Sequence, residues 1–347
     1  MTNAHKALEW VDGSLRYIDQ ESLPGKLQYI ETGNYRNVID AIKRLKIRGA
    51  PAIGIAAAFA SVLAAKEGAS NTGNNFVLWL ENVLSEIEQA RPTARNLSFA
   101  IGQMRKILQN YDGKGKTKIV EAFLTEAKRI YDEDTELCIK IGKFGAELIE
   151  DGYNIITHCN TGMLVTAGIG TALGVIYYAK EQGKKVHVYA DETRPLLQGA
   201  RLTTWECMNL GIPVTLICDG AAADVLRRKK IGCAIVGADR IAGNGDVANK
   251  IGTYSLAVNC KEHSVPFYVA APYSTFDFSL DSGSDIPIEI RDGKEVSTLL
   301  GNAIAPENVD VYNPAFDITP AELISGIITD AGVFRYPYGR WGSLKTA

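Results

Sequence analysis

The chain has 347 residues, a length sufficient for two domains, and its 46% hydrophobic and 22% charged residues are ordinary for a soluble globular protein. A net charge of −3 without a long basic run argues against nucleic acid as the main partner. The sequence has no apolar run of membrane-spanning length, no signal-peptide core, and no C-x-x-C pair among its six cysteines. We therefore expect a cytoplasmic protein with reduced thiols and without a zinc site.

Residues 8–31 contain short alternating apolar and polar stretches, separated by the turn signals Asp12-Gly13 and Pro24-Gly25. This pattern predicts a small antiparallel sheet. Asn34 can cap a helix over residues 35–45, because its side-chain oxygen can accept a backbone N–H of the first turn.

An Ala-rich helix is predicted from Ala50 to about Lys66. Pro51 suits its first turn, where the missing N–H of proline costs nothing. Gly49 lets the backbone approach a ligand closely, and the free N–H groups of the first helical turn, with Arg48 beside them, make a plausible phosphate cradle. The structural alternative is a tight loop–helix junction that is packed by small residues.

Three more helices are predicted over residues 75–89, 97–111 and 116–151, the last with a possible break near residues 132–134. The loop before the second of them carries Arg91 and Arg95 beside a helix start, an arrangement that suits an anion but is also common on surfaces. The end of the long helix predicts a boundary between domains 1–150 and 151–347.

From Tyr153 onward, short apolar runs alternate with helix-length segments. The runs are residues 155–157, 186–189, 214–217, 234–236, 267–269 and 309–312. Such alternation predicts βαβ units and a mostly parallel sheet with helices on both faces. The fold class is therefore α/β, with a small N-terminal domain of short antiparallel sheet and helices before the parallel sheet domain.

Two of these runs end beside reactive side chains: Cys159 follows the first run and Asp239 follows the fourth. In open α/β sheets, ligands bind at the carboxyl ends of the strands. We expect a helix N-terminus near Cys159, which would favour its thiolate. After Asp239 we expect a glycine-rich turn, with Asn249 and Lys250 leading into a helix. The structural alternatives are an inert cysteine and an aspartate that caps the helix.

The glycines of residues 168–174 follow a G-x-G-x-x-x-G spacing, one residue off the dinucleotide-binding fingerprint. They are expected inside a helix, about ten residues past the strand, which argues for close helix packing and against a nicotinamide-dependent dehydrogenase. Charged residues 191–201 follow the second run and suit a polar wall of a site. For Glu192 and Arg194 we favour a supporting role in that loop.

Taken together, several of these stretches resemble the 5-methylthioribose-1-phosphate isomerase family of methionine salvage, which is related to the regulatory subunits of eukaryotic initiation factor 2B. The resemblance spans roughly residues 8–329 and rests on residues 48–51, 91–93, 158–162, 191–201, 236–254 and 312–317. It implies a Rossmann-like C-terminal domain and a homodimer that acts on a sugar phosphate without metal or nucleotide cofactor.

The resemblance also implies site residues. Cys159 and Asp239 match the family's catalytic pair, and the substrate-binding positions match Arg48, Gly49, Ala50, Arg91, Gln198, Asn249 and Lys250. In the implied reaction an aldose 1-phosphate becomes a ketose 1-phosphate, with protonated Asp239 as acid toward the ring oxygen. Cys159 acts either as the base at C2 or as a stabiliser of a direct hydride shift.

Two alternatives to this function stay open. The first is 5-deoxyribose 1-phosphate as the substrate of the same chemistry. Thr161 departs from the alanine common in the family, and Thr161 and Met163 are candidate positions for a change of sugar. The second is a non-catalytic regulatory subunit of the same fold.

Overall fold

The computed structural model describes residues 5–71, 73–92, 94–111 and 115–338, and contacts divide the chain into two compact units. The first unit, the helical unit, comprises Met1–Glu136 and Met163–Gly170. The second, the sheet unit, comprises Leu137–Gly162 and Thr171–Ala347. The domain boundary at residue 150 stays a prediction.

The helical unit begins with the predicted antiparallel sheet, in the order β1-β2-β3. Its strands are β1 (Leu8–Val11), β2 (Ser14–Ile18) and β3 (Tyr29–Thr32). Helix α1 (Tyr35–Lys43) starts where the sequence predicts it, because the Asn34 side chain accepts the backbone N–H of Arg36 at 2.9 Å.

Longer helices follow, and the last of them continues into the sheet unit. They are α2 (Ala50–Asn71), α3 (Phe76–Glu88), α4 (Arg95–Gln109) and α5 (Lys116–Ala146). The expected break in α5 is wrong. Arg129 pairs with Glu126 and Glu133, one helical turn away on either side, and such pairs stabilise a continuous helix.

Helix α2 is longer than the sequence suggested, and by length and composition it could cross a membrane. However, 83% of its apolar window is buried inside the protein. It contacts α1, α3 and α4, so it is the central helix of this unit.

The segment Met163–Gly170 packs against the helical unit, although it follows the first strand of the other unit. Gln20 Nε2 donates to the Leu164 carbonyl at 2.6 Å, and the Ala167 N–H donates to the Asp134 carboxylate at 2.6 Å. Val165 fills the space that a side chain on Gly49 would need, since a Cβ there would lie 2.3 Å from the Val165 Cβ.

The sheet unit contains a seven-stranded sheet in the order β16-β15-β10-β7-β4-β5-β6, parallel except for β16. The six parallel strands are β4 (Tyr153–Thr157), β5 (Val186–Asp191), β6 (Val214–Ile217), β7 (Ile231–Val236), β10 (Phe267–Ala270) and β15 (Gly326–Thr329). In chain order their arrangement is 3-2-1-4-5-6, as in Rossmann folds. The predicted mostly parallel α/β sheet is therefore confirmed.

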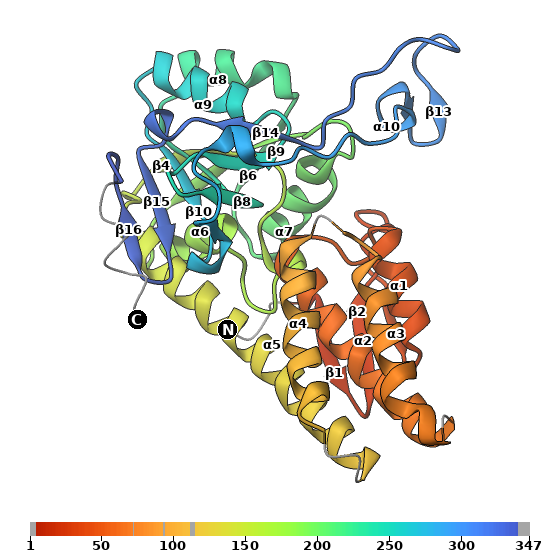
Figure 1. Ribbon diagram of the computed structural model, residues 1–347. Helices are drawn as coiled ribbons and strands as arrows, with labels where there is room; N and C mark the ends of the chain where they lie inside the picture. Colours follow the sequence, from red (N-terminus) through yellow and green to blue (C-terminus); the bar gives the residue numbers. More distant parts are fainter. Residues whose placement is uncertain (1–4, 72, 93, 112–114, 339–347) are drawn as a thin grey trace. The chain divides into compact units, whose positions relative to one another are not determined.

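Helices cover both faces of this sheet (Figure 1). Helix α6 contacts β5, β7 and β10, while α9 contacts β7 and β10 and is itself covered by α8. Their bounds are α6 (Ala172–Glu181), α8 (Ala222–Arg228) and α9 (Thr253–Glu262), and the short α7 (Thr204–Asn209) contacts β6.

The last predicted strand, residues 309–312, is wrong. Val309 is 47% exposed and Tyr312 is 80% exposed, in an arm that extends from the sheet unit in Figure 1. The arm carries α10 (Lys294–Ser297), β12 (Thr298–Leu299) and β13 (Asn302–Ala303). The sheet is instead completed by β15, which is buried throughout, and by β16 (Gly332–Phe334).

The stretch after β7 also differs from its prediction. It forms a β-hairpin of β8 (Arg240–Ala242) and β9 (Val247–Lys250), so Asn249 and Lys250 lie on a strand. The hairpin is the centre of a second, four-stranded sheet with β11 (Phe276–Asp277) and β14 (Phe316–Thr319). Asn244-Gly245-Asp246 is a hairpin-type turn sequence, with Gly245 at φ +94°.

Candidate active site

The two predicted catalytic residues follow the strands that flank the point where the strand order reverses. Cys159 lies two residues after β4 and Asp239 three residues after β7, and β4 and β7 are paired neighbours. Their loops touch, because a Cβ on Gly237 would lie 2.4 Å from the Thr161 methyl carbon. In doubly wound sheets this crevice is where ligands bind.

Cys159 has an unusual backbone conformation that is held by two buried threonines. Its φ is +64°, a left-handed conformation that costs a residue other than glycine about 1–3 kcal/mol. Its N–H donates to Thr193 Oγ1 at 2.9 Å, and its carbonyl accepts the hydroxyl of Thr203 at 2.6 Å. No local sequence pattern predicts these two contacts, because the threonines lie 34 and 44 residues from Cys159 in the chain.

The expected helix N-terminus beside Cys159 is wrong. The chain enters the segment Met163–Gly170, and the next α-helix, α6, starts only at Ala172. A helix dipole at that position therefore does not account for any thiolate stabilisation. The first two glycines of the disfavoured dinucleotide pattern, Gly168 and Gly170, consequently precede α6 rather than lying inside it.

His158, the residue before Cys159, is buried and has oxygen partners at both ring nitrogens. Nδ1 lies 2.9 Å from Asp191 Oδ2, and Nε2 lies 2.8 Å from the carbonyl oxygen of Ile251. Burial alone would lower the pKa of His158, but the hydrogen bond and charge of Asp191 outweigh it and raise the pKa. Gly252 covers the ring, since a Cβ there would lie 2.7 Å from His158 Cε1.

Asp219, two residues after β6, extends this network. Its two carboxylate oxygens accept the backbone N–H groups of Thr193 and Arg194, each at 2.7 Å. His158, Asp191 and Asp219 place ligand-type atoms within 4.8 Å of one another. Since the nitrogens of His158 and the oxygens of Asp219 are already engaged, we interpret this cluster as a hydrogen-bond network rather than a set of metal ligands.

The residues on the hairpin side of the crevice are well anchored. Asp239 is half-buried, and its N–H donates to the Ala248 carbonyl at 2.9 Å. Asn249 and Lys250 are buried on β9. Asn249 Nδ2 donates to Thr253 Oγ1 at 3.0 Å, and Lys250 Nζ donates to the Ala315 carbonyl at 2.8 Å.

Gln198 comes from a π-helical turn, η3 (Gly199–Thr203), that begins directly after it. It is 6% exposed, and its Oε1 has no hydrogen-bond partner within the described structure. A buried acceptor without a donor calls for a ligand or a water molecule. Asp191 Oδ1 is buried and unpaired in the same way. Arg194, expected to support its loop, donates to the carbonyls of Pro195 and Val296.

The remaining predicted residues belong to the helical unit. Arg48, Gly49 and Ala50 lie at the start of α2 and Arg91 lies before α4. These two helix starts adjoin, because a Cβ on Gly54 would lie 2.7 Å from the Asn96 carbonyl oxygen. Gly49 was expected to let a ligand approach the backbone. At φ +84° it also leaves space for Val165, which a side chain at this position would overlap. Thr93, part of the Arg91 motif, lies outside the described residues.

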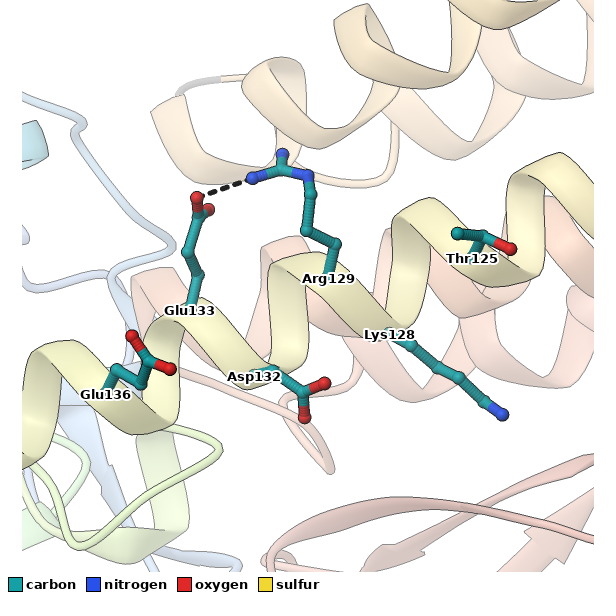
Figure 2. A pocket seen from close by; sticks show the side chains of 6 residues that line it. All are labelled: Thr125, Lys128, Arg129, Asp132, Glu133 and Glu136. Atoms are coloured by element: carbon teal, nitrogen blue, oxygen red, sulfur yellow. Dashed lines mark hydrogen bonds and ion pairs between the residues drawn. The ribbon is translucent and has the colours of Figure 1, made fainter.

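A surface depression along α5 contains none of the predicted site residues (Figure 2). It is lined by Thr125, Lys128, Arg129, Asp132, Glu133 and Glu136. Figure 2 shows Arg129 turned toward Glu133 along the helix, so this is a solvated face stabilised by ion pairs of neighbouring turns.

Comparisons with known proteins agree with this architecture. The model of the Initiation factor 2 subunit family matches residues 46–336. A methylthioribose-1-phosphate isomerase of Geotalea uraniireducens is 53% identical over 333 residues, which cover 96% of both chains.

Two solved structures resemble the chain closely. A 5-methylthioribose 1-phosphate isomerase of Pyrococcus horikoshii superposes with a TM-score of 0.91 at 42% identity, covering 98% of this chain and 95% of that one. A translation initiation factor eIF-2B subunit delta of A. fulgidus superposes with a TM-score of 0.87 at 44% identity, covering 97% of each. The protein therefore belongs to the initiation factor 2 subunit family and, within it, to the methylthioribose-1-phosphate isomerases.

Proposed function

We propose that the protein converts 5-methylthioribose 1-phosphate to 5-methylthioribulose 1-phosphate, with Cys159 and Asp239 as its catalytic residues. The observation that carries the proposal is that both residues follow the two strands, β4 and β7, between which the strand order reverses. The chain is also 53% identical to a named isomerase. The mechanism proposed below uses only protein side chains and includes no cofactor.

The chemistry follows from the substrate. The anomeric oxygen carries phosphate, so the sugar cannot open to a free aldehyde. Protonated Asp239 donates its proton to the ring oxygen as the bond between that oxygen and C1 breaks, and the Cys159 thiolate removes the proton from C2. The resulting enol phosphate takes the thiol proton at C1. Asp239 recovers a proton from the C2 hydroxyl, which leaves the ketone and both groups in their starting states.

A direct hydride shift from C2 to C1 is the other route, with Cys159 stabilising the charge that develops. Turnover of substrate deuterated at C2 separates the two routes. Full retention of deuterium at C1 favours the hydride shift, whereas exchange with solvent identifies the proton transfer.

Substrate binding is assigned by charge and by buried polar atoms. Arg48, the N–H groups of Gly49 and Ala50, Arg91 and Lys250 bind the phosphate. Gln198 and Asn249 bind sugar hydroxyls, and the unpaired, buried Oε1 of Gln198 supports this role. Fixed placement of the substrate contributes several kcal/mol to lowering the barrier.

The test is turnover by the purified protein, followed by phosphorus NMR. Cys159→Ser and Asp239→Asn should each lower kcat by several orders of magnitude, with unchanged circular dichroism. Cys218→Ser and Asp224→Asn are matched controls, because both side chains are exposed, and they should retain wild-type kcat. A Cys159 or Asp239 variant that keeps a tenth of the wild-type kcat would remove that residue from the mechanism.

The same assay distinguishes this function from two alternatives, another sugar substrate and a regulatory subunit. If 5-deoxyribose 1-phosphate is the true substrate, its kcat/KM exceeds that of the methylthio sugar by more than tenfold. Burial of the methylthio group contributes only about 1–2 kcal/mol, so few substitutions near Thr161 and Met163 could change the preference. Absence of turnover with either sugar would favour a regulatory subunit, which the likeness to the A. fulgidus protein keeps as a second candidate.

We further propose that the protein is a homodimer in the cytoplasm. The dimer rests on the family resemblance, and the cytoplasm rests on the six cysteines, which form no C-x-x-C pair in the sequence.

A further inference from the structure

Three neighbouring strands of the sheet each place a polar residue at the same position past their ends. Cys159, Thr193 and Asp219 each lie two residues after the last residue of β4, β5 and β6. Because these strands are parallel and adjacent, the three residues lie side by side along one edge of the sheet.

Hydrogen bonds connect the three residues in sequence. Asp219 accepts the N–H of Thr193 at 2.7 Å, and Thr193 Oγ1 accepts the N–H of Cys159 at 2.9 Å. Thr193 Oγ1 also donates to the Asp191 carbonyl at 3.1 Å, so its hydroxyl proton is directed away from Cys159. Thr193 Oγ1 therefore acts as the acceptor for the Cys159 N–H.

The other side of Cys159 is held from the π-helical turn. Thr203, the last residue of η3, donates its hydroxyl to the Cys159 carbonyl at 2.6 Å, and it accepts Asn160 Nδ2 at 3.3 Å. π-Helical turns recur at functional sites. Gly199 lets this turn approach, because a Cβ there would lie 1.7 Å from the Asp191 carbonyl oxygen.

The geometry requires such restraints. Cys159 and Thr193 both have φ +64°, a conformation that is unfavourable for cysteine and a rare outlier for a β-branched residue. Unfavourable conformations of this kind persist only where the surroundings enforce them, and they cluster at active sites. A cysteine has one side-chain torsion, so a backbone held by the two threonines restricts its sulfur atom to about three staggered positions.

We propose that Thr193 and Thr203 are positioning residues for Cys159: their hydroxyl groups hold its N–H and carbonyl in the left-handed conformation that aims the sulfur atom at the substrate. The inference rests on the proposed role of Cys159 as the catalytic thiol. Neither threonine takes part in the chemistry itself, and each acts only through the Cys159 peptide groups.

The test compares Thr193→Val and Thr203→Val with Thr193→Ser and Thr203→Ser. Valine keeps the shape of threonine but removes the hydroxyl, whereas serine keeps the hydroxyl. The valine variants should lower kcat by about 10- to 100-fold with KM changed less than about twofold, and the serine variants should restore kcat. Should a valine variant fail to fold, the alanine variant at the same site takes its place with the same expectation.

Thr329→Val is the matched control. Its hydroxyl is also buried, accepts the N–H of Ala331 at 3.0 Å and donates to the Gly332 carbonyl at 3.1 Å, but Thr329 is the last residue of β15, which is separated from β4 by β10 and β7 in the sheet. It should leave kcat unchanged in a folded protein. If Thr329→Val lowered kcat as much as the other valine variants do, general destabilisation would explain the loss and the proposal would be overturned.

A second readout does not depend on turnover. The alkylation rate of Cys159 by iodoacetamide, followed peptide by peptide with mass spectrometry across pH, should change in the Thr193 and Thr203 variants and not in Thr329→Val. If the wild-type protein turns over neither sugar, the proposed function fails while this measurement still tests the positioning. An unchanged Cys159 alkylation profile in both hydroxyl-deleted variants would refute it.

Discussion

Asp134→Asn should stabilise the protein in a strongly pH-dependent manner. Asp134 is buried on α5, where its carboxylate accepts the N–H of Ala167. The hydrogen bond lowers the pKa of Asp134, but burial raises it by a larger amount, so the pKa rises from 3.8 to about 7. An asparagine oxygen can accept the same N–H, so the substitution preserves this contact and removes the ionisation.

The sign follows from proton binding. Between pH 3.8 and about pH 7 the native state keeps the Asp134 proton while the unfolded chain loses it, so wild-type stability falls as pH rises through this window. The difference of about three in pKa, at ~1.36 kcal/mol each, corresponds to about 4 kcal/mol at full ionisation. The variant carries no such loss, so its advantage should be about 2 kcal/mol at pH 5 and reach its full value of about 4 kcal/mol by about pH 8.

Thermal unfolding followed by circular dichroism between pH 5 and pH 8.5 measures this difference. A gain of about 4 kcal/mol corresponds to roughly 5 °C in Tm at the upper pH limit for a chain of 347 residues. Asp132→Asn is the control, because Asp132 lies on the same helix but is exposed, and it should show no pH-dependent gain. An Asp134→Asn advantage of the same size at pH 5 and pH 8.5 would show that the carboxyl group does not titrate in this range.

Three further predictions concern binding, packing and assembly. Arg91→Ala should weaken substrate binding by about 2–4 kcal/mol, seen as a higher KM and weaker inhibition by free phosphate, because a charge-assisted contact is lost. Arg44→Ala, which removes an exposed pair with Glu21, should leave both unchanged; equal effects would place Arg91 outside the phosphate site. Gly199→Ala should lower the free energy of unfolding, measured with urea, by about 1–3 kcal/mol, because the added Cβ would overlap the Asp191 carbonyl oxygen. An unchanged free energy of unfolding would contradict this close approach. Light scattering should give twice the chain mass of 37.6 kDa, and a mass near one chain would exclude the dimer.

Local sequence patterns were sufficient where an element is defined by its own residues. The run 214–217 matches β6 residue for residue, and Asn34 caps α1 as its side chain suggests. The positions of Cys159 and Asp239 at strand ends were predicted on the same basis, because buried apolar runs mark the strands of a parallel sheet. The pairing of β4 with β7, which makes the two strand ends neighbours, was not predicted. Their catalytic roles stay predictions.

Patterns failed where distant contacts decide the conformation. Residues Met163, Leu164 and Val165 are buried, but against the helical unit, so no local pattern shows that the helix after Cys159 is postponed. The sequence does not predict the β8–β9 hairpin, because Asn249 and Lys250 lie just before the helix α9 and their pattern resembles the start of that helix. The hydroxyl contacts of Thr193 and Thr203 depend on residues 34 and 44 positions away in sequence.

The detour of Met163–Gly170 has a consequence for dissecting the protein by truncation. The chain passes between the two compact units three times: within α5, after Gly162 and after Gly170. A fragment that ends at residue 150 would retain Gln20, Gly49 and Asp134 but lose Leu164, Val165 and Ala167, which contact them. Such a fragment would expose a buried carboxylate and an empty apolar space, so we expect it to aggregate. A fusion that supplies residues 163–170 through a short linker should recover a folded helical unit.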